Sequence, residues 1–548
     1  MSFVPASSFR SEQGLRLLRE NTRDLLPYDP HDTSIEVLAS ILDYKDVLVR
    51  TACGSGKTGI IALIVSSLPK IPGIFSSYKP WFDTKPAFIV ICPTNELEFD
   101  IEFKLRKCGI GAVVLNFDVL MAAQNNNSTS LLWTEVQNSQ VLLISPELLC
   151  NDSVHKQLAA THDSTLSFKK RCAVLIVDEA HLVYEWGRSF REAYRYIGEL
   201  RVQLNSTVRL LALTATLRED GPLGYVLKTF GLREGQYIDI HHSNLRPEIR
   251  TTTSPLESTL STAENFPELR WIVNPVLLGI TIIFTPDRSS ALRITLYLRK
   301  CNEYLASQSR IRKWDSLNAS VHNTETRAMI SAMDVEVDRL IIVSTTILMV
   351  GVDFQGVKRI INLEPDDFDK EVQMEGRMRG AGECYVYFSK HTFEEARKRL
   401  EEEKNTGQDG LIAKKSQREN SSGKKKKPPM HIHFAKRIAS DCRTPIQNET
   451  YNNPPFGQHP CSCRDCSARP DPPTFVCICS GCCKGESQRD RIQTLRQLAT
   501  DAIGQRNRLK TTSGTHTLYL RIPPMPRPSS SHQSLSSSEI YFLLSQQS

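Results

Sequence analysis

The sequence predicts an α/β fold made of two tandem parallel-sheet domains, followed by a small cysteine-rich zinc subdomain and a disordered tail. Three observations predict it. Short apolar runs form two successive series over residues 1–403, the composition changes abruptly after residue 403, and eight of the fifteen cysteines lie between Cys442 and Cys483. At about 150 residues per domain, a chain of 548 residues is too long for a single small module.

The first series of apolar runs predicts the strands of a first domain over residues 1–230. Its members are Asp46–Arg50, Phe88–Pro93, Val141–Pro146, Ala173–Asp178 and Leu210–Thr216. Apolar runs without alternation are typical of parallel strands that crossover helices bury on both faces. A second series predicts a second domain of the same kind over residues 240–403, joined to the first near residues 225–255. Its members are Gly279–Thr285, Arg339–Ser344, Val357–Leu363 and Cys384–Phe388.

The C-terminal part of the chain has a different composition. After the charged helix expected at residues 394–404, residues 404–429 indicate a basic solvated linker, and residues 430–485 form the cysteine-rich subdomain. One amphipathic helix is expected at Arg489–Lys510. Residues 523–538 are too rich in Pro and Ser to order alone, so the tail over 486–548 is expected to be partly disordered.

The charge is unevenly distributed. Residues 404–548 hold 22 Lys and Arg against 10 Asp and Glu, whereas the rest of the chain is slightly acidic. A basic appendage favours an anionic polymer as partner, although a disordered tail or a nuclear-import signal such as Lys424–Lys427 gives the same count. There is no secretory signal and no run of eighteen apolar residues, so we expect an intracellular protein without a membrane partner.

A glycine-rich loop follows the first predicted strand and precedes an apolar helix. Its backbone N–H groups and the helix N-terminus favour phosphate, with Lys57 on the β/γ-phosphates and Thr58 on Mg²⁺. A chance match on a surface turn is disfavoured by this strand and helix context. The expected ATP-binding residues are Thr51, Gly54, Ser55, Gly56, Lys57 and Thr58, of which Thr51 stands where the strict pattern has glycine.

An acidic pair ends the fourth predicted strand of the first series, in the sequence Asp178-Glu179-Ala180-His181. Ligands of open α/β sheets bind at the carboxyl ends of the strands. We therefore expect Asp178 to hold Mg²⁺ and Glu179 to orient and activate the attacking water. Alone, the motif is also compatible with acids that cap a helix, but together with the glycine-rich loop it indicates nucleotide hydrolysis.

These motifs resemble those of superfamily 2 helicases and, more narrowly, of the RecQ-like DNA helicases. The resemblance covers roughly residues 20–470, with further matches at 145–147, 182–191, 213–216, 282–286, 344–354 and 373–380. It implies two RecA-like domains and an ATP-dependent 3′-5′ DNA helicase that uses ATP with Mg²⁺. The implied partners are single-stranded and forked DNA, and the implied setting is DNA recombination and repair in the nucleus, with the cytoplasm also possible.

The resemblance also implies roles for individual residues. Arg377 and Arg379 would supply the arginine finger, and Gln373 would belong to the ATP site. Trp186 and Phe190 are also spaced as core residues on one helix face, which is the alternative for this pair. The residues implied to couple hydrolysis to DNA are His181, Thr214, Thr216 and Asp353, and those implied to contact DNA are Trp186, Phe190, Arg191 and Thr345.

Three positions depart from the family pattern. Ser34 stands where the family has the glutamine that reads adenine, and Met349 replaces a glycine. The Gly-Arg-x-x-Arg arrangement is shortened at residues 376–379. If this segment is helical, the deletion rotates Arg379 by about 100° and leaves the finger role to Arg377 alone.

The cysteine cluster predicts zinc. By resemblance, the ligands are Cys442, Cys461, Cys463 and Cys466, although the family has two residues between its first clustered cysteines and this chain has one. Four thiolates around one metal replace the core that so short a segment cannot build. A second C-x-C-x-x-C segment contains Cys477, Cys479 and Cys482. Three alternatives are open for it: the two segments share one metal ion, they bind two metal ions, or the second segment stays free. His431 or His433 is a further candidate ligand.

Two alternatives to the helicase remain open at this level. One is an RNA-acting or non-unwinding translocating ATPase. The other is a catalytically degenerate nucleic-acid-binding protein that keeps the fold without the finger.

Overall fold

The computed structural model describes residues 8–76, 78–160, 166–187, 191–204, 206–274, 277–304, 310–314, 338–349, 354–408, 429–456, 461–468, 477–479 and 482. Several predictions concern residues outside this set. They are those on Phe190, Asp353, most of the basic linker with the Lys424–Lys427 run, the helix at Arg489–Lys510 and the tail.

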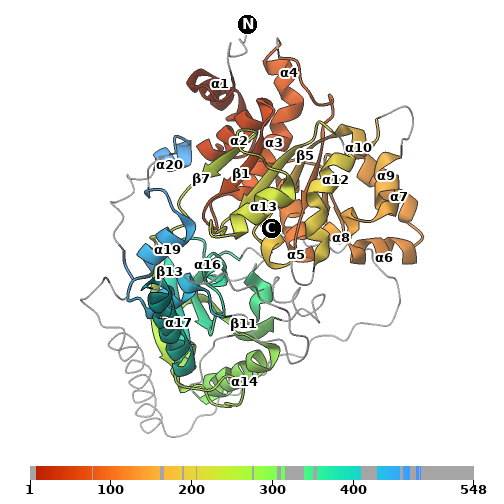
Figure 1. The fold of residues 1–548 in the computed structure, drawn as a ribbon. Helices are drawn as coiled ribbons and strands as arrows, with labels where there is room; N and C mark the ends of the chain where they lie inside the picture. Colours follow the sequence, from red (N-terminus) through yellow and green to blue (C-terminus); the bar gives the residue numbers. More distant parts are fainter. Residues whose placement is uncertain are drawn as a thin grey trace, which may run out of the picture. The chain divides into compact units, whose positions relative to one another are not determined.

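The first domain, coloured red to yellow-green in Figure 1, is a parallel sheet with strand order β3-β4-β2-β5-β6-β1-β7. All neighbouring strands pair in parallel. The five predicted runs are strands of this sheet, while β3 and β7 occupy its two edges and were not predicted. The strands are β1 Asp46–Arg50, β2 Ala87–Ile91, β3 Ala112–Leu115, β4 Val141–Ile144, β5 Cys172–Val177, β6 Arg209–Thr214 and β7 Tyr237–His241.

Helices cover both faces of this sheet. One face packs against α1 Glu12–Thr22, α2 Asp32–Leu42, α3 Lys57–Ser67, α4 Ile71–Ile74 and α5 Asn95–Lys107. The other packs against α6 Phe117–Asn125, α7 Thr129–Asn138, α8 Pro146–Leu149, α9 Asp152–Ala159, α10 Phe168–Arg171, α12 Ile197–Leu204 and α13 Pro222–Phe230, with α11 Leu182–Glu185 after β5. This two-sided cover is why the strands are apolar without alternation.

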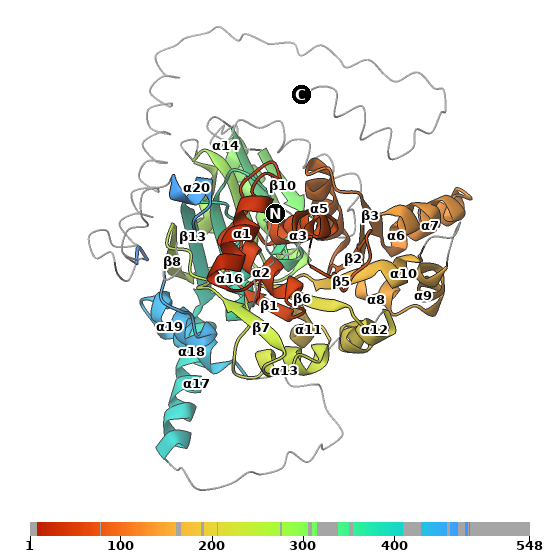
Figure 2. The same ribbon diagram turned by 90° about the horizontal axis from the view of Figure 1, so that it is seen from above.

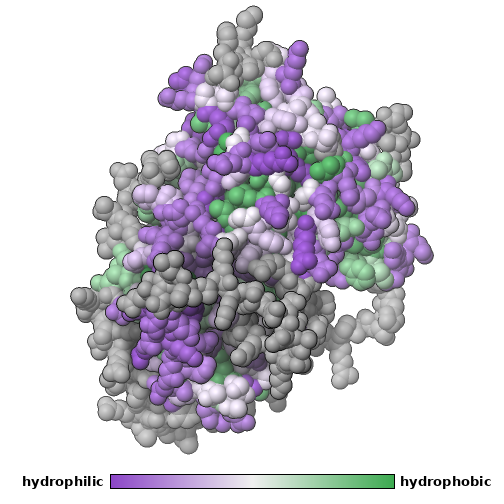
Figure 3. Space-filling view, in the orientation of Figure 1, coloured by the Kyte–Doolittle hydropathy of each residue, from purple (hydrophilic) through white to green (hydrophobic). Residues whose placement is uncertain are grey.

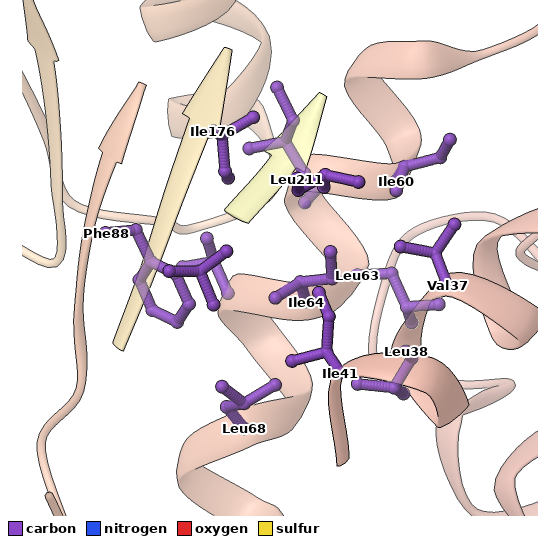
Figure 4. Close-up of a cluster of buried hydrophobic side chains, with 14 of the residues drawn as sticks. Val37, Leu38, Ile41, Ile60, Leu63, Ile64, Leu68, Phe88, Ile176 and Leu211 are labelled. Carbon is purple, nitrogen blue, oxygen red and sulfur yellow. The ribbon is translucent and has the colours of Figure 1, made fainter. Parts of the chain in front are cut away.

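Helix α3 follows the glycine-rich loop and lies at the centre of the first core. Ile60, Leu63 and Ile64 pack against Val37, Leu38 and Ile41 of α2 on one side and against Phe88, Ile176 and Leu211 of the sheet on the other (Figure 4). The segment Lys57–Ile74 is long and apolar enough in composition to cross a membrane. Its residues from Ile60 to Val65 are buried in this core, which accounts for the composition.

Among the residues that are coloured in Figure 3, hydrophilic ones cover most of the face shown.

The second domain is a parallel sheet with order β10-β11-β9-β12-β13-β8. Its strands are β8 Ile249–Leu256, β9 Gly279–Phe284, β10 Arg310–Trp314, β11 Arg339–Ser344, β12 Val357–Leu363 and β13 Gly382–Ser389. The second series of apolar runs forms the four inner strands, and the edge strands β8 and β10 were not predicted. The two parallel-sheet domains expected from the sequence are therefore confirmed, and residues 242–248 connect their sheets.

The cysteine-rich region contributes α18 Ile432–Ala439, α19 Arg443–Tyr451 and the short α20 Arg464–Ser467. Helices α18 and α19 share a core with α16 Phe368–Glu375 and α17 Lys390–Gln408 on one face of the second sheet (Figure 2). The other face packs against α14 Arg288–Tyr304 and a 3₁₀ turn at Pro267–Val273. Up to α19, this region is thus attached to the second domain.

A buried carboxyl on α5 leads to a pH-dependent prediction. Glu98 is fully buried and accepts a hydrogen bond from Asn116 Nδ2 at 2.8 Å. Burial raises the pKa of Glu98 to about 8 despite that bond. Between its ordinary value and pH 8, the unfolded state ionises and the folded state does not, so stability falls as the pH rises.

Above pH 5, Glu98→Gln is therefore expected to unfold at a higher denaturant concentration than the parent, and this difference should grow up to pH 8. The difference in free energy of unfolding grows by at most about 1.4 kcal/mol per pH unit. Denaturant unfolding at pH 5, 6, 7 and 8 measures the effect, with Glu135→Gln at an exposed position on α7 as control. A difference that stays constant with pH would contradict the assignment.

Candidate nucleotide-hydrolysis site

The phosphate loop connects β1 to α3. Gly54 and Gly56 have φ values of 82° and 88°, which is the left-handed region that favours glycine. Gly56 is the N-cap of α3, and no side chain caps the helix there. Its first N–H groups are therefore available to an anion. The Ser55 Oγ is buried and has no hydrogen-bond partner among the described residues, as fits a loop built around a phosphate.

A pocket of about 500 Å³ opens above this loop and is lined by both domains. The first domain contributes phosphate-loop residues, including Lys57 and Thr58, together with the acidic pair. The second contributes Arg377 and Arg379. The pocket wall also includes Ser34 of α2, which the sequence analysis had singled out, and three residues before α2 that it had not. These three residues are Pro27, Tyr28 and His31.

The acidic pair follows β5 and is buried. Glu179 has a φ of 49°, and its N–H donates to Asp178 Oδ1 at 2.9 Å. Burial, with the charge of Glu179, raises the pKa of Asp178. Burial also acts to raise the pKa of Glu179, but Lys57, His181 and the two arginines lower it below its ordinary value. Glu179 is thus the ionised member of the pair.

From His181, which lies beside the acidic pair, a chain of hydrogen-bonded side chains leads across the domain boundary. His181 Nδ1 lies 3.5 Å from Glu179 Oε2 and 3.1 Å from Thr214 Oγ1. Burial lowers the pKa of His181 to about 4, so the ring is neutral at pH 7. Thr214 Oγ1 donates to the Thr216 carbonyl at 3.4 Å, and Gln373 Nε2 of α16 donates to Thr216 Oγ1 at 2.7 Å.

The phosphate loop itself contacts the second domain. Cys53 Sγ donates to Gln373 Oε1 at 3.3 Å. Arg246, in the segment between the sheets, donates to the carbonyls of Cys53 and Met378, each at 3.0 Å. Sequence reasoning missed Arg246, because no motif surrounds it. These bonds make the loop part of the domain interface.

The shortened arginine motif does not rotate one arginine out of the site. Helix α16 ends at Glu375 and is capped by Gly376, so residues 377–379 are not helical and the 100° step of a helix does not apply. Arg377 and Arg379 both line the pocket, and Arg379 Nη1 lies 2.8 Å from the position that a Cβ on Gly54 would take. The condition under which Arg377 alone would carry the finger role, a helical segment, is therefore not met.

Gly376 lies against Cys53 of the phosphate loop, so a substitution there tests how closely the two domains must approach. A Cβ at this position would lie 2.3 Å from Cys53 Cβ and 2.6 Å from Cys53 Sγ. Gly376→Ala is expected to hold the domains apart, at a cost of about 1–3 kcal/mol, and to lower kcat/KM for ATP about tenfold or more. Steady-state ATP hydrolysis measures this. Gly224→Ala is the control, since a Cβ there meets nothing within 4 Å, and equal rates for both variants would show that the contact is dispensable.

Of the residues expected to contact DNA, Arg191 and Trp186 of the first domain lie together. Arg191 forms a double hydrogen bond with Glu147, at 2.6 and 2.5 Å, and lies 5.3 Å from the Trp186 ring. Trp186 is half-buried and packs against Tyr194 and both domain cores. Thr345 is half-buried after β11. Met349 is buried in the second core, so its side chain points away from the surface.

The cysteines form two sets, and the grouping differs from the one expected. Among the described residues, one set consists of Cys442, Cys477, Cys479 and Cys482. The other consists of His31, Cys461, Cys463 and Cys466. In each set all ligand atoms lie within 4.8 Å of one another. The structure thus corrects the set Cys442, Cys461, Cys463 and Cys466, because repeated C-x-C-x-x-C spacing does not determine the fourth ligand. His431 and His433 belong to neither set and lie beside Asp220.

Two family models match the chain. The DEAD/DEAH box helicase model covers residues 33–221, and the helicase conserved C-terminal domain model covers residues 278–382. These ranges contain the phosphate loop, the acidic pair and the arginine motif.

Several curated proteins are similar to the chain. The ATP-dependent DNA helicase hus2/rqh1 of Schizosaccharomyces pombe is 26% identical over 65% of this chain and 24% of its own length. The bifunctional 3′-5′ exonuclease/ATP-dependent helicase WRN of Mus musculus is 24% identical over 67% of this chain and 23% of its own length. The ATP-dependent DNA helicase RecQ of Haemophilus influenzae is 29% identical over 33% of this chain and 25% of its own length. The matches thus span about a quarter of these relatives.

Among solved structures, the DUF1998 helicase MrfA bound to DNA superposes with a TM-score of 0.51 at 16% identity, over 74% of this chain and 54% of that one. Similarity at this level concerns the fold alone. The family models and the curated relatives confirm the resemblance inferred from the motifs. The chain thus resembles the RecQ-like superfamily 2 helicases in its motifs, in both helicase family models and in its curated relatives.

Proposed function

We propose that the protein is an ATP-dependent DNA helicase that couples ATP hydrolysis to 3′-5′ translocation on single-stranded DNA and to duplex unwinding. The main support is that the phosphate loop, the acidic pair and two arginines of the second domain line one pocket. The relatives named as ATP-dependent DNA helicases support DNA over RNA as the substrate.

The pocket residues suit γ-phosphate cleavage. Lys57, Arg377 and Arg379 place positive charge around the phosphates, where charge spreads in the transition state. Ionised Glu179 orients the attacking water. Thr58 and Asp178 are the residues that would hold Mg²⁺, which supplies charge neutralisation between the β- and γ-phosphates when bound. Ser34 in the pocket wall has no amide to read adenine, so we expect weak discrimination between ATP and other nucleoside triphosphates.

The series of side chains from Glu179 to Gln373, which is hydrogen-bonded from His181 onward, would couple hydrolysis to domain movement. Opening of the interface breaks the bond between Thr216 and Gln373, and this change reaches Glu179 through Thr214 and His181. Alternate closing and opening of the two domains would then move a bound strand. Trp186 and Arg191, on the segment that follows the acidic pair, are the proposed DNA contacts in the first domain, and Thr345 is the one in the second.

We also propose zinc at Cys442, Cys477, Cys479 and Cys482. The Cys442 and Cys477 sulfurs lie 3.6 Å apart, close to the separation of about 3.8 Å in a tetrahedral site with Zn–S bonds of about 2.3 Å. Thiol ligands of this number and spacing are typical of structural zinc.

The experiment combines DNA-stimulated ATP hydrolysis with unwinding of duplexes that carry a 3′ or a 5′ overhang. We expect single-stranded DNA to stimulate hydrolysis, only the 3′-tailed duplex to be unwound, and Lys57→Ala to abolish both. If the parent hydrolyses ATP no faster than Lys57→Ala, the protein binds nucleic acid without being an ATPase. Equal stimulation by RNA would contradict the preference for DNA, and hydrolysis without strand separation would indicate a translocating ATPase.

A further inference from the structure

The second cysteine set, Cys461, Cys463 and Cys466, lies against His31 of the first domain, which precedes it by 430 or more residues in the sequence. His31 Nδ1 is 3.6 Å from Cys461 Sγ, 3.4 Å from Cys463 Sγ and 3.6 Å from Cys466 Sγ. We propose that these four residues form a second zinc site, of Cys₃His type, which fastens the C-terminal segment to the ATP-binding domain beside the phosphate loop. This proposal goes beyond the helicase function and does not depend on it.

The distances fit a metal better than they fit hydrogen bonds. In a tetrahedral zinc site with Zn–S of about 2.3 Å and Zn–N of about 2.0–2.1 Å, each sulfur lies about 3.6 Å from the nitrogen. His31 Nδ1 has three sulfurs at this separation. One ring nitrogen carries at most one proton or one lone pair in the ring plane, so it cannot bond three thiols at once. A single atom at the centre of the four ligands satisfies all of them.

A disulfide does not explain the set either. Cys461, Cys463 and Cys466 are all free thiols, and pairing two of them would leave the third thiol and the imidazole unexplained. Three thiolates and one imidazole are ligands that zinc accepts in closed structural sites.

The surroundings hold both halves of the site in place. The Ser462 N–H and hydroxyl donate to the Asp32 carboxylate at 2.6 and 2.9 Å, and the Arg464 N–H donates to Asp29 Oδ2 at 2.8 Å. The Asp32 N–H donates to Cys461 Sγ at 3.3 Å. Bonds of this kind to ligating groups and their neighbours are typical of the second shell of metal sites.

The site connects both domains. Helix α19 packs on the second domain and ends at Tyr451, ten residues before Cys461. A chain of that length spans at most about 36 Å, so a metal at Cys461 tethers the second domain to the first while it permits limited opening. His31 also forms part of the nucleotide pocket, and its Cδ2 lies 3.3 Å from the position of a Cβ on Gly56. The metal therefore also orients a side chain that packs against the phosphate loop.

Metal analysis of the purified full-length protein tests the proposal. We expect two zinc ions per chain in the parent and one in His31→Ala, in Cys463→Ser and in Cys477→Ser. The double variant Cys463→Ser/Cys477→Ser should hold none. His31→Cys should keep two ions, because a fourth thiolate replaces the imidazole, and this result separates ligation from mere damage to the fold.

Cobalt substitution adds a second readout. The visible bands of cobalt-loaded Cys477→Ser, which keeps the Cys₃His set, should differ from those of cobalt-loaded His31→Ala, which keeps the four-cysteine set. One zinc ion in the parent, or two in a folded His31→Ala, would overturn the proposal. ATP hydrolysis by the same preparations tests the helicase function separately, because metal content does not depend on turnover.

Discussion

Arg377→Ala and Arg379→Ala are each expected to lower kcat for DNA-stimulated ATP hydrolysis by about 10³-fold, within the range of about 10³–10⁵ for arginine fingers. Both side chains enter the pocket that holds the phosphate loop and Glu179. Charge on the γ-phosphate is redistributed only in the transition state, so their loss affects turnover more than ATP binding. We therefore expect KM for ATP to change by much less than kcat.

Steady-state kinetics with saturating single-stranded DNA measures this effect. Lys398→Ala removes an exposed cation from α17 of the same domain and should leave both constants within about twofold. If KM rises while kcat is unchanged, the arginines bind ATP without assisting its cleavage. If only one of the two variants loses activity, the other arginine is not a finger.

Arg437→Ala is expected to have the largest effect on stability, about 3–5 kcal/mol. Arg437 of α18 is 1% exposed and donates to Glu371 Oε1 of α16 at 3.0 and 2.8 Å. Arg443 of α19 reaches the same carboxylate at 3.4 Å and also pairs with Glu375. Removing Arg437 leaves part of the charge of Glu371 buried without its closest partner, in the contact that attaches the cysteine-rich region to the second domain.

The neighbouring residue provides the control. Lys436 pairs with Glu449 at 2.7 Å, but this pair is exposed, so Lys436→Ala should cost at most about 1 kcal/mol. Denaturant unfolding followed by tryptophan fluorescence compares the two midpoints. Equal midpoints would mean that the buried pair contributes no more than the exposed one, and that α18 is held by apolar packing alone.

The accuracy of strand prediction depended on the position of each strand in its sheet. The inner strands are continuously apolar because helices cover both faces, and their runs stand out in the sequence. At the edges, β7 is largely half-exposed and β8 is polar from Arg250 to Ser254, so neither forms a continuous apolar run. β3 is as short and as apolar as the predicted strand β4, so its length does not explain why it was missed. The end of α16 at Glu375, close to Cys53 of the phosphate loop, was not predicted either.

The sequence by itself determined the local chemistry of the nucleotide site. The phosphate loop and the acidic pair are each contiguous in sequence. They follow β1 and β5, so both lie at the carboxyl ends of the parallel strands. Only the tertiary structure decided which groups from distant segments meet. Arg246 joins the two domains, and His31 meets thiols 430 to 435 residues away. The reason is physical: a ligand set or an interface is defined by distances in space, and spacing along the chain constrains those distances only within a single element or loop.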